Sequence, residues 1–225
     1  PYSKKNYYWL TFGGETGKRM EEKSSLNNQD AYVQSNTFAY KSYDKDSVNI
    51  AKGGRDYYGD PLNSSTKNRT YINSLSGILP SSTITYIFKV ANTSTSLITF
   101  RLDESGTSIY SGSIYGKTDY FSGKVLKTSV NVTNNLSDER STLKFVLTST
   151  ATDAEMYLDY FEIAYRKYLN AVSDNLIFFS KDTSAVISYT LSNFSNSSIK
   201  TFDITDFANV AIISNASISG SQFTF

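Results

Sequence analysis

The chain has 225 residues, which is enough for one large domain or two small ones with a substantial hydrophobic core. Its 22 Lys and Arg residues nearly balance 21 Asp and Glu residues, so the formal charge of +1 gives no basis for a nucleic-acid partner. The absence of Cys and His excludes disulfides, thiolate nucleophiles, zinc–thiolate sites and the usual general base. We therefore expect no catalytic residue, no metal and no cofactor in this chain.

Residues 1–74 are predicted to hold one N-terminal strand and a long loop. The aromatic run Asn6–Phe12 indicates a strand that ends at two glycines. The next stretch, Glu15–Asp46, has few aliphatic residues and predicts an extended surface excursion with one short strand near Ala31–Val33. It leads into Asp46–Asp60, a Gly-rich segment with an Arg-Asp-Tyr-Tyr centre.

Residues 75–168 have the pattern of an antiparallel β-sandwich. Short runs of alternating polar and apolar residues are separated by Gly, Asn, Asp or Ser turns, which is typical of strands in a sandwich of jelly-roll type. The predicted strands are Thr83–Val90, Leu97–Leu102, Ser108–Tyr115, Lys124–Val132, Thr142–Thr148 and Met156–Ala164.

Residues 169–225 predict a second, smaller β module. Its expected strands are Leu176–Phe179, Val186–Leu191, Lys200–Ile204 and Val210–Ile213. The chain begins at Pro1 without an initiating Met and ends on alternating aromatic residues, which suggests a fragment whose last module is truncated. The fold class expected is therefore all-β, an antiparallel sandwich followed by a smaller β module.

The Gly53–Asp60 segment is the candidate binding site. Arg55 offers a planar fork for a carboxylate, Tyr57 and Tyr58 offer contact area, and Asp60 completes the motif, so this loop could dock another domain. The alternative is a tight loop in which Arg55 pairs with a nearby carboxylate or carbonyl and only braces the fold. Pro61 and the glycines limit the loop's conformations, which favours a preformed surface.

Two pairs of carboxylates are candidates for catalysis or metal binding. On a regular strand Asp159 and Glu162 point to opposite faces, which disfavours an acid–base pair. The Asp203–Asp206 loop lacks the dense oxygen-ligand spacing of a calcium loop. Neither pair predicts chemistry.

Four segments together resemble a known family: Tyr7–Met20, Gly54–Asp60, Leu158–Tyr165 and Phe202–Asp206. They are similar to the region upstream of the caspase-like domain in gingipain-type cysteine peptidases, and above all to the signal peptidases or sortases of type IX secretion in Bacteroidetes. Gly54–Asp60 is the most specific match. Relatives typically have the sequence Gly-Arg-Glu-Trp-Tyr-Gly-Glu here, so Asp56, Tyr57 and Asp60 are conservative differences from the family.

The resemblance implies that the nucleophilic Cys and its His lie in a following domain, so this chain would be a non-catalytic support. Its expected partners are that peptidase domain of the same polypeptide and an outer-membrane type IX secretion component. The expected location is exported, at the outer membrane or cell surface. The alternative function is a carbohydrate-binding or adhesin-type sandwich with a platform of exposed Tyr residues or Trp9, although aromatic residues in sheets mostly pack across strands.

Overall fold

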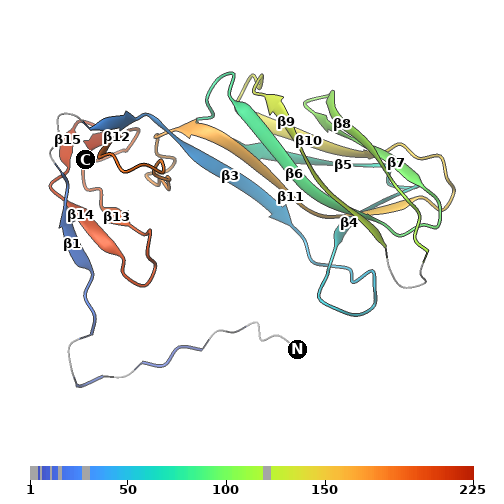
Figure 1. The fold of residues 1–225 in the computed structure, drawn as a ribbon, viewed down its shortest axis with the longest axis horizontal. Coiled ribbons are helices and arrows are strands. Elements are labelled where there is room, and N and C mark those ends of the chain that lie inside the picture. Colours follow the sequence, from blue (N-terminus) through green and yellow to red (C-terminus); the bar gives the residue numbers. More distant parts are fainter. Residues whose placement is uncertain (1–4, 6, 11, 15–16, 27–30, 119–122) are drawn as a thin grey trace.

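The structure is a computed structural model that describes residues 5, 7–10, 12–14, 17–26, 31–118 and 123–225. Sixteen strands and no helix occur in these ranges, which confirms the all-β fold class. None of the described residues therefore forms a helix long and apolar enough to cross a membrane. Figure 1 shows a large sandwich and a smaller module side by side, with β3 leading from one to the other.

The sandwich consists of two antiparallel sheets. The first has the order β3 (Asn36–Asp44), β11 (Glu155–Tyr168), β6 (Thr83–Asn92) and β9 (Lys124–Thr133), and β4 (Gly59–Asn63) pairs with the beginning of β11. The second has the order β5 (Asn68–Ser74), β10 (Arg140–Leu147), β7 (Ile98–Glu104) and β8 (Thr107–Ile114). The six strands predicted between residues 75 and 168 are thus all present.

Strict alternation along the central strands builds the main core. On β6, Tyr86 and Phe88 are buried while their neighbours are partly exposed, and Phe145 on β10 is buried opposite them. The rings of Phe88 and Phe145 meet edge to face at 5.7 Å between centroids, an arrangement favoured by the ring quadrupoles. Aromatic rings therefore fill much of the space between the two sheets.

The smaller module combines strands from both ends of the chain. One sheet has the order β1 (Glu21–Ser24), β14 (Ala211–Ser214) and β13 (Thr201–Asp203); the other has β15 (Ser217–Ser219), β16 (Gln222–Thr224), β12 (Ile187–Leu191) and β2 (Tyr32–Gln34). The β1–β14 and β2–β12 pairs are parallel. A second core forms here from Leu169, Ala171, Tyr189, Leu191, Phe194 and Phe223.

Residues 1–74 differ most from expectation. The short strand expected near Ala31–Val33 is present as β2, but the predicted surface excursion also contains β1 and the nine-residue strand β3. The sandwich sheets take in β3, β4 and β5 from before residue 75. Within the predicted strand Asn6–Phe12, residues 7–10 and 12 are irregular and exposed, while residues 6 and 11 lie outside the described ranges. The segment Leu176–Phe179 is also irregular rather than a strand.

Candidate functional site

The Gly-rich segment singled out in the sequence connects β3 to β4. β3 and β4 pair with consecutive stretches of β11. The loop between them therefore leaves the sheet and rejoins it at neighbouring positions. The loop is closed at its base by a two-residue bridge, in which the amide of Val48 donates to the carbonyl of Tyr58 and the Tyr58 amide donates back, both at 2.8 Å. Residues 49–57 form the tip beyond this bridge. Positive φ values at Lys52 and Gly54 allow the tip to turn.

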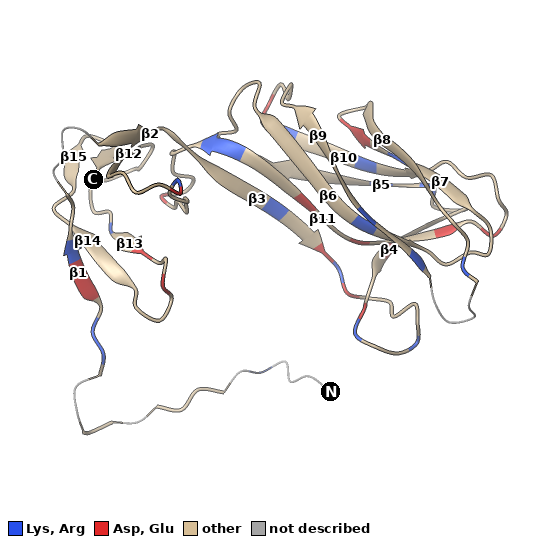
Figure 2. Ribbon diagram, in the orientation of Figure 1, with Lys and Arg blue, Asp and Glu red and all other residues tan. Residues whose placement is uncertain are grey.

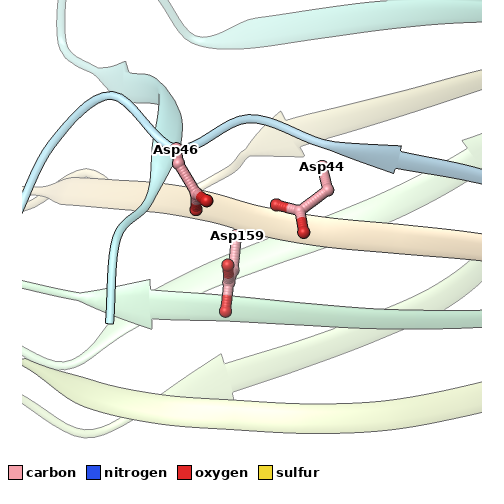
Figure 3. A group of neighbouring side chains, drawn as sticks. All are labelled: Asp44, Asp46 and Asp159. Carbon is pink, nitrogen blue, oxygen red and sulfur yellow. The ribbon is translucent and has the colours of Figure 1, made fainter. Parts of the chain in front are cut away.

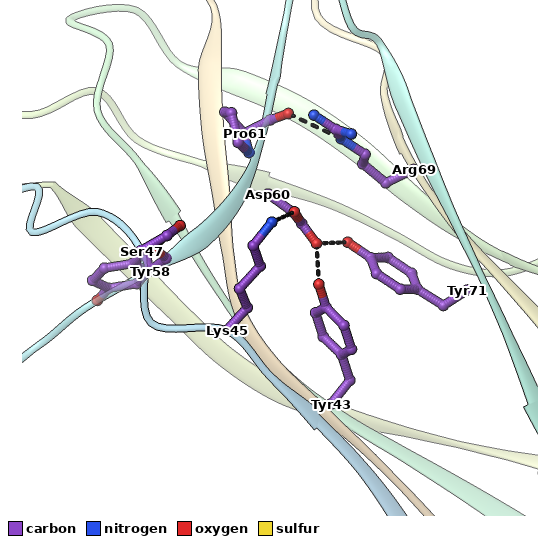
Figure 4. Close-up of polar contacts among 8 residues, drawn as sticks. All are labelled: Tyr43, Lys45, Ser47, Tyr58, Asp60, Pro61, Arg69 and Tyr71. Atoms are coloured by element: carbon purple, nitrogen blue, oxygen red, sulfur yellow. Dashed lines mark hydrogen bonds and ion pairs between the residues drawn. The ribbon is translucent and has the colours of Figure 1, made fainter. Parts of the chain in front are cut away.

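Asp60 is the polar centre of the loop base (Figure 4). Its carboxylate accepts hydrogen bonds from the hydroxyls of Tyr43 and Tyr71, the latter at 2.8 Å, and pairs with the ammonium of Lys45 at 2.8 Å. The partners come from β3, β5 and the loop itself. Asp60 therefore ties together both sheets of the sandwich and the loop between β3 and β4.

The geometry around Asp60 depends on the residue before it. A Cβ at Gly59 would lie 2.6 Å from the carbonyl oxygen of Lys45, which is closer than backbone atoms tolerate. Asp60 itself has a φ of 34°, in the region that L-residues rarely adopt. The glycine of the Gly-Asp pair is thus required for the chain to enter β4 beside Lys45.

The hydrogen bonds at Asp60 change its own pKa and those of Tyr43 and Tyr71. Burial would raise the pKa of Asp60, but the hydrogen bonds from Lys45, Tyr43 and Tyr71 outweigh it and lower the pKa to about 2. Burial and the bond to Asp60 raise the pKa of Tyr43 to about 12 and also raise that of Tyr71. The carboxylate therefore stays ionised and both phenols stay protonated across the neutral range.

Three further carboxylates converge beside this network, from Asp44, Asp46 and Asp159 (Figure 3). One oxygen from each lies within 4.8 Å of the others. Burial, followed by the charges of Asp46 and Asp159, raises the pKa of Asp44. Three carboxylates of this kind could offer oxygen ligands to a hard divalent cation. However, the buried Asp159 already has a cationic partner, because the ammonium of Lys89 lies 2.7 Å from its oxygen.

A β-bulge explains why Asp159 reaches this group. Along β11, Leu158 lies opposite Val90 and Tyr160 lies opposite Lys89, so Asp159 is the extra residue. Lys89 alternates with inward-pointing neighbours and its ammonium is on the outer side of the sheet, where it also lies 5.2 Å from the centre of the Tyr58 ring. The regular alternation assumed for Asp159 and Glu162 is therefore broken at Asp159, whose charged partner is Lys89.

The structure separates the four residues predicted to bind a partner into two pairs. Tyr58 and Asp60 are 2% and 8% exposed and belong to the loop base, so they cannot contact a partner without rearrangement. Arg55 is exposed at the tip, and Tyr57 is 44% exposed. Within the described residues Arg55 forms no ion pair or hydrogen bond, so the local pairing considered for it with Asp56 or Asp60 does not occur.

Sequence reasoning did not find Tyr43, Lys45, Tyr71 and Lys89. Tyr43 and Lys45 lie in the stretch 15–46, whose sequence predicts a surface excursion, and Tyr71 lies on a strand that the sequence does not predict. Lys89 lies on a predicted strand, but only the bulge at Asp159 brings the two together. The single usable signal was the Gly-Asp pair at the end of the motif.

Neither a protein-family profile nor a curated protein sequence matches the chain. Among solved structures, dimeric latent PorU from Porphyromonas gingivalis is similar over 91% of this chain and 20% of PorU, with 15% identity and a TM-score of 0.73. The CBM36-1 domain of a xylanase from the hindgut metagenome of Trinervitermes trinervoides aligns over 56% of this chain and 96% of its own, with 13% identity and a TM-score of 0.37. A family 35 carbohydrate-binding module from Clostridium thermocellum aligns over 56% of this chain and 90% of its own, with 16% identity and a TM-score of 0.35.

The similarity to PorU concerns the arrangement of strands, since the identity is low. It extends over nearly the whole chain, including both the sandwich and the smaller module, but over only a fifth of PorU. The two carbohydrate-binding modules share too little of the arrangement to support an argument. The chain thus has the fold of one region of PorU.

Proposed function

We propose that residues 1–225 are a non-catalytic β-rich accessory region of a PorU-like cysteine peptidase or sortase of type IX secretion, exported to the outer membrane or cell surface. The region would support and position a caspase-like domain that follows it in the same polypeptide. The observation that carries the proposal is the likeness to PorU over 91% of the chain, together with the Gly54–Asp60 motif. An outer-membrane secretion component is the second partner we propose.

The side chains are consistent with support rather than hydrolysis. A cysteine peptidase requires a thiolate and a base, and this chain has neither Cys nor His. Of the carboxylates near the loop, Asp159 pairs with Lys89, and Asp60 is held by three partners. These groups stabilise the loop base, so the peptidase chemistry would have to come from another domain.

The loop tip is the surface we propose for contact with the peptidase domain. Tyr58 and Asp60 hold the base, so the tip is presented in a preformed position and loses little conformational entropy on binding. No side chain of the described residues pairs with the guanidinium of Arg55, so it could pair with a carboxylate of another domain, and Tyr57 adds aromatic contact area. A few anchors of this type can supply most of the affinity of an interface.

The test uses the intact parent polypeptide. We expect it to remove the C-terminal signal from an exported substrate, and we expect a cysteine-alkylating reagent to abolish that activity. A parent without such cleavage, or one whose cleavage resists alkylation, would contradict the proposal. The parent sequence should also contain an α/β domain after residue 225, with a His followed some tens of residues later by a Cys.

The carbohydrate-binding alternative has no specific support in the structure. Exposed Tyr residues lie on separate elements: Tyr40 is on β3, Tyr115 follows β8 in the opposite sheet, and Tyr168 ends β11. Tyr43, Tyr71 and Tyr86 donate hydrogen bonds to carboxylates within the sandwich. Within residues 31–118 and 123–225, these rings therefore do not form one flat platform for stacking sugars.

A further inference from the structure

A groove lies where the sandwich meets the smaller module. It has a volume of about 530 Å³ and runs between β2 with the start of β3 on one side and the irregular segment 179–182 on the other. Arg166, at the end of β11, and Leu79 complete its lining. The groove is thus bordered by β2 and the start of β3 on one side and by an irregular segment on the other.

The walls of this groove are fixed by two buried polar side chains. Gln34 donates from its amide nitrogen to the carbonyl of Phe179 and accepts from the amide of Lys181, both at 2.8 Å. Thr37 accepts from the amide of Phe179 at 2.8 Å. Gln34 is 8% exposed and Thr37 is 1% exposed, so these bonds are shielded from water. The groove is preorganised because the irregular segment is held by side chains rather than by a sheet ladder.

Three aromatic rings line the groove and remain about half exposed: Tyr32 at 48%, Phe38 at 46% and Phe179 at 50%. They come from three different segments and converge on one concave surface. Apolar surface gathered in a depression is more typical of a recognition site than the same area scattered singly. The groove can therefore receive an apolar side chain.

Positive charge predominates around these rings. Arg166 donates one hydrogen bond to the side chain of Asn36 at 3.1 Å, and its other N–H groups have no partner among the described residues. The ammonium of Lys181 lies 4.6 Å from the centre of the Tyr32 ring, and Asp182 is the one acidic residue of the lining. Burial and the charge of Lys41 lower the pKa of the adjacent Lys167. Figure 2 shows this basic end of β11 facing the smaller module.

We propose that the groove binds an extended acidic polypeptide segment. A carboxylate of the segment pairs with Arg166, and an apolar side chain packs against Phe38 and Phe179. A neutral sugar fits less well, because both ends of the Gln34 amide and the side-chain oxygen of Asn36 are already bonded. This binding does not depend on the proposed function of the loop tip, which lies at the other end of β3.

The test is a fluorescence anisotropy titration with two labelled pentapeptides, Asp-Phe-Glu-Phe-Asp and Lys-Phe-Lys-Phe-Lys, and with a labelled alginate hexasaccharide. We expect saturable binding of the acidic peptide, at least about tenfold weaker binding of the basic one, and weakening by salt. Arg166→Gln and Phe179→Ser should each lower the affinity for the acidic peptide about tenfold. The matched control is Arg140→Gln, since Arg140 is an exposed residue outside the groove, paired with Asp138.

Three results would overturn the proposal. These are equal affinity for the two peptides, an affinity that Arg166→Gln leaves unchanged, and tighter binding of alginate than of the acidic peptide. The last would assign the groove to an acidic polysaccharide. Circular dichroism of each variant checks the fold, and Lys181→Gln provides a second charge variant whose backbone bond to Gln34 is retained.

Discussion

Replacing Asp60 with Asn tests whether the loop base is held by charge. The fall in the pKa of Asp60 from 3.8 to about 2 corresponds to roughly 2 kcal/mol of stabilisation, at about 1.4 kcal/mol per pH unit. An Asn side chain can still accept from Tyr43 and Tyr71, so the change removes mainly the charge paired with Lys45. We expect the free energy of unfolding at pH 7 to fall by about 2 kcal/mol.

The pH dependence follows from the direction of the shift. Because the folded pKa is below the unfolded one, the Asp60 contribution is complete above about pH 5 and disappears as the pH falls through 4 towards 2. The native chain and Asp60→Asn should therefore differ at pH 7 and converge near pH 2. Tyr43 affects stability at alkaline pH. Its raised pKa gives stability that is present below pH 10 and is lost as the pH rises through about 12.

The assay is urea unfolding followed by far-ultraviolet circular dichroism, together with hydrogen exchange of peptides that cover β3 to β5. The chain has two separate cores and need not unfold in one step, so hydrogen exchange is needed to show which part of the chain loses stability. Asp138→Asn is the control: its exposed pair with Arg140 should change stability by less than about 1 kcal/mol. Equal stability of native chain and Asp60→Asn at pH 7 would refute the reasoning.

Two further predictions concern the same region, and a third concerns the whole chain. Gly59→Ala should lower the unfolding midpoint by several degrees, since its Cβ would meet the Lys45 carbonyl oxygen at 2.6 Å; an unchanged midpoint in a thermal scan would contradict this. Lys89→Met should cost about 2–4 kcal/mol in urea unfolding by leaving buried Asp159 unpaired, and Lys89→Met with Asp159→Leu should recover most of the loss. The isolated chain should not hydrolyse fluorogenic Arg or Lys peptides; cleavage lost on mutating this chain would count against it.

The strands between residues 75 and 168 were predictable because each carries its own local signal. Period-two alternation reports a face buried against a core, and the intervening turns use residues that favour sharp reversal. β6 and β10 alternate almost without exception. In contrast, β3 has Lys41 and Ser42 among its aromatic residues because it is an edge strand whose pairing with β11 supplies most of its order. Its local sequence therefore carried too little hydrophobic signal.

The candidate site was predictable only in part. Gly59 and Asp60 stood out because a Gly-rich motif indicates unusual backbone geometry. The burial of Tyr58 could not be separated from the exposure of Tyr57, since adjacent aromatic residues in a loop have no periodic pattern to follow. The Asp159–Lys89 pair depends on one extra residue in β11, and a single-residue bulge reverses every prediction based on alternation.

The measurement that tests the central claim most directly is the rate at which the intact parent removes the C-terminal signal of an exported substrate when its loop tip is changed. With Arg55→Ala and Tyr57→Ala combined, we expect this rate to fall at least about tenfold, while the stability of residues 1–225 stays unchanged. Arg140→Ala, far from the tip, should process the substrate normally. Normal processing by the double variant would show that the tip does not hold the peptidase domain.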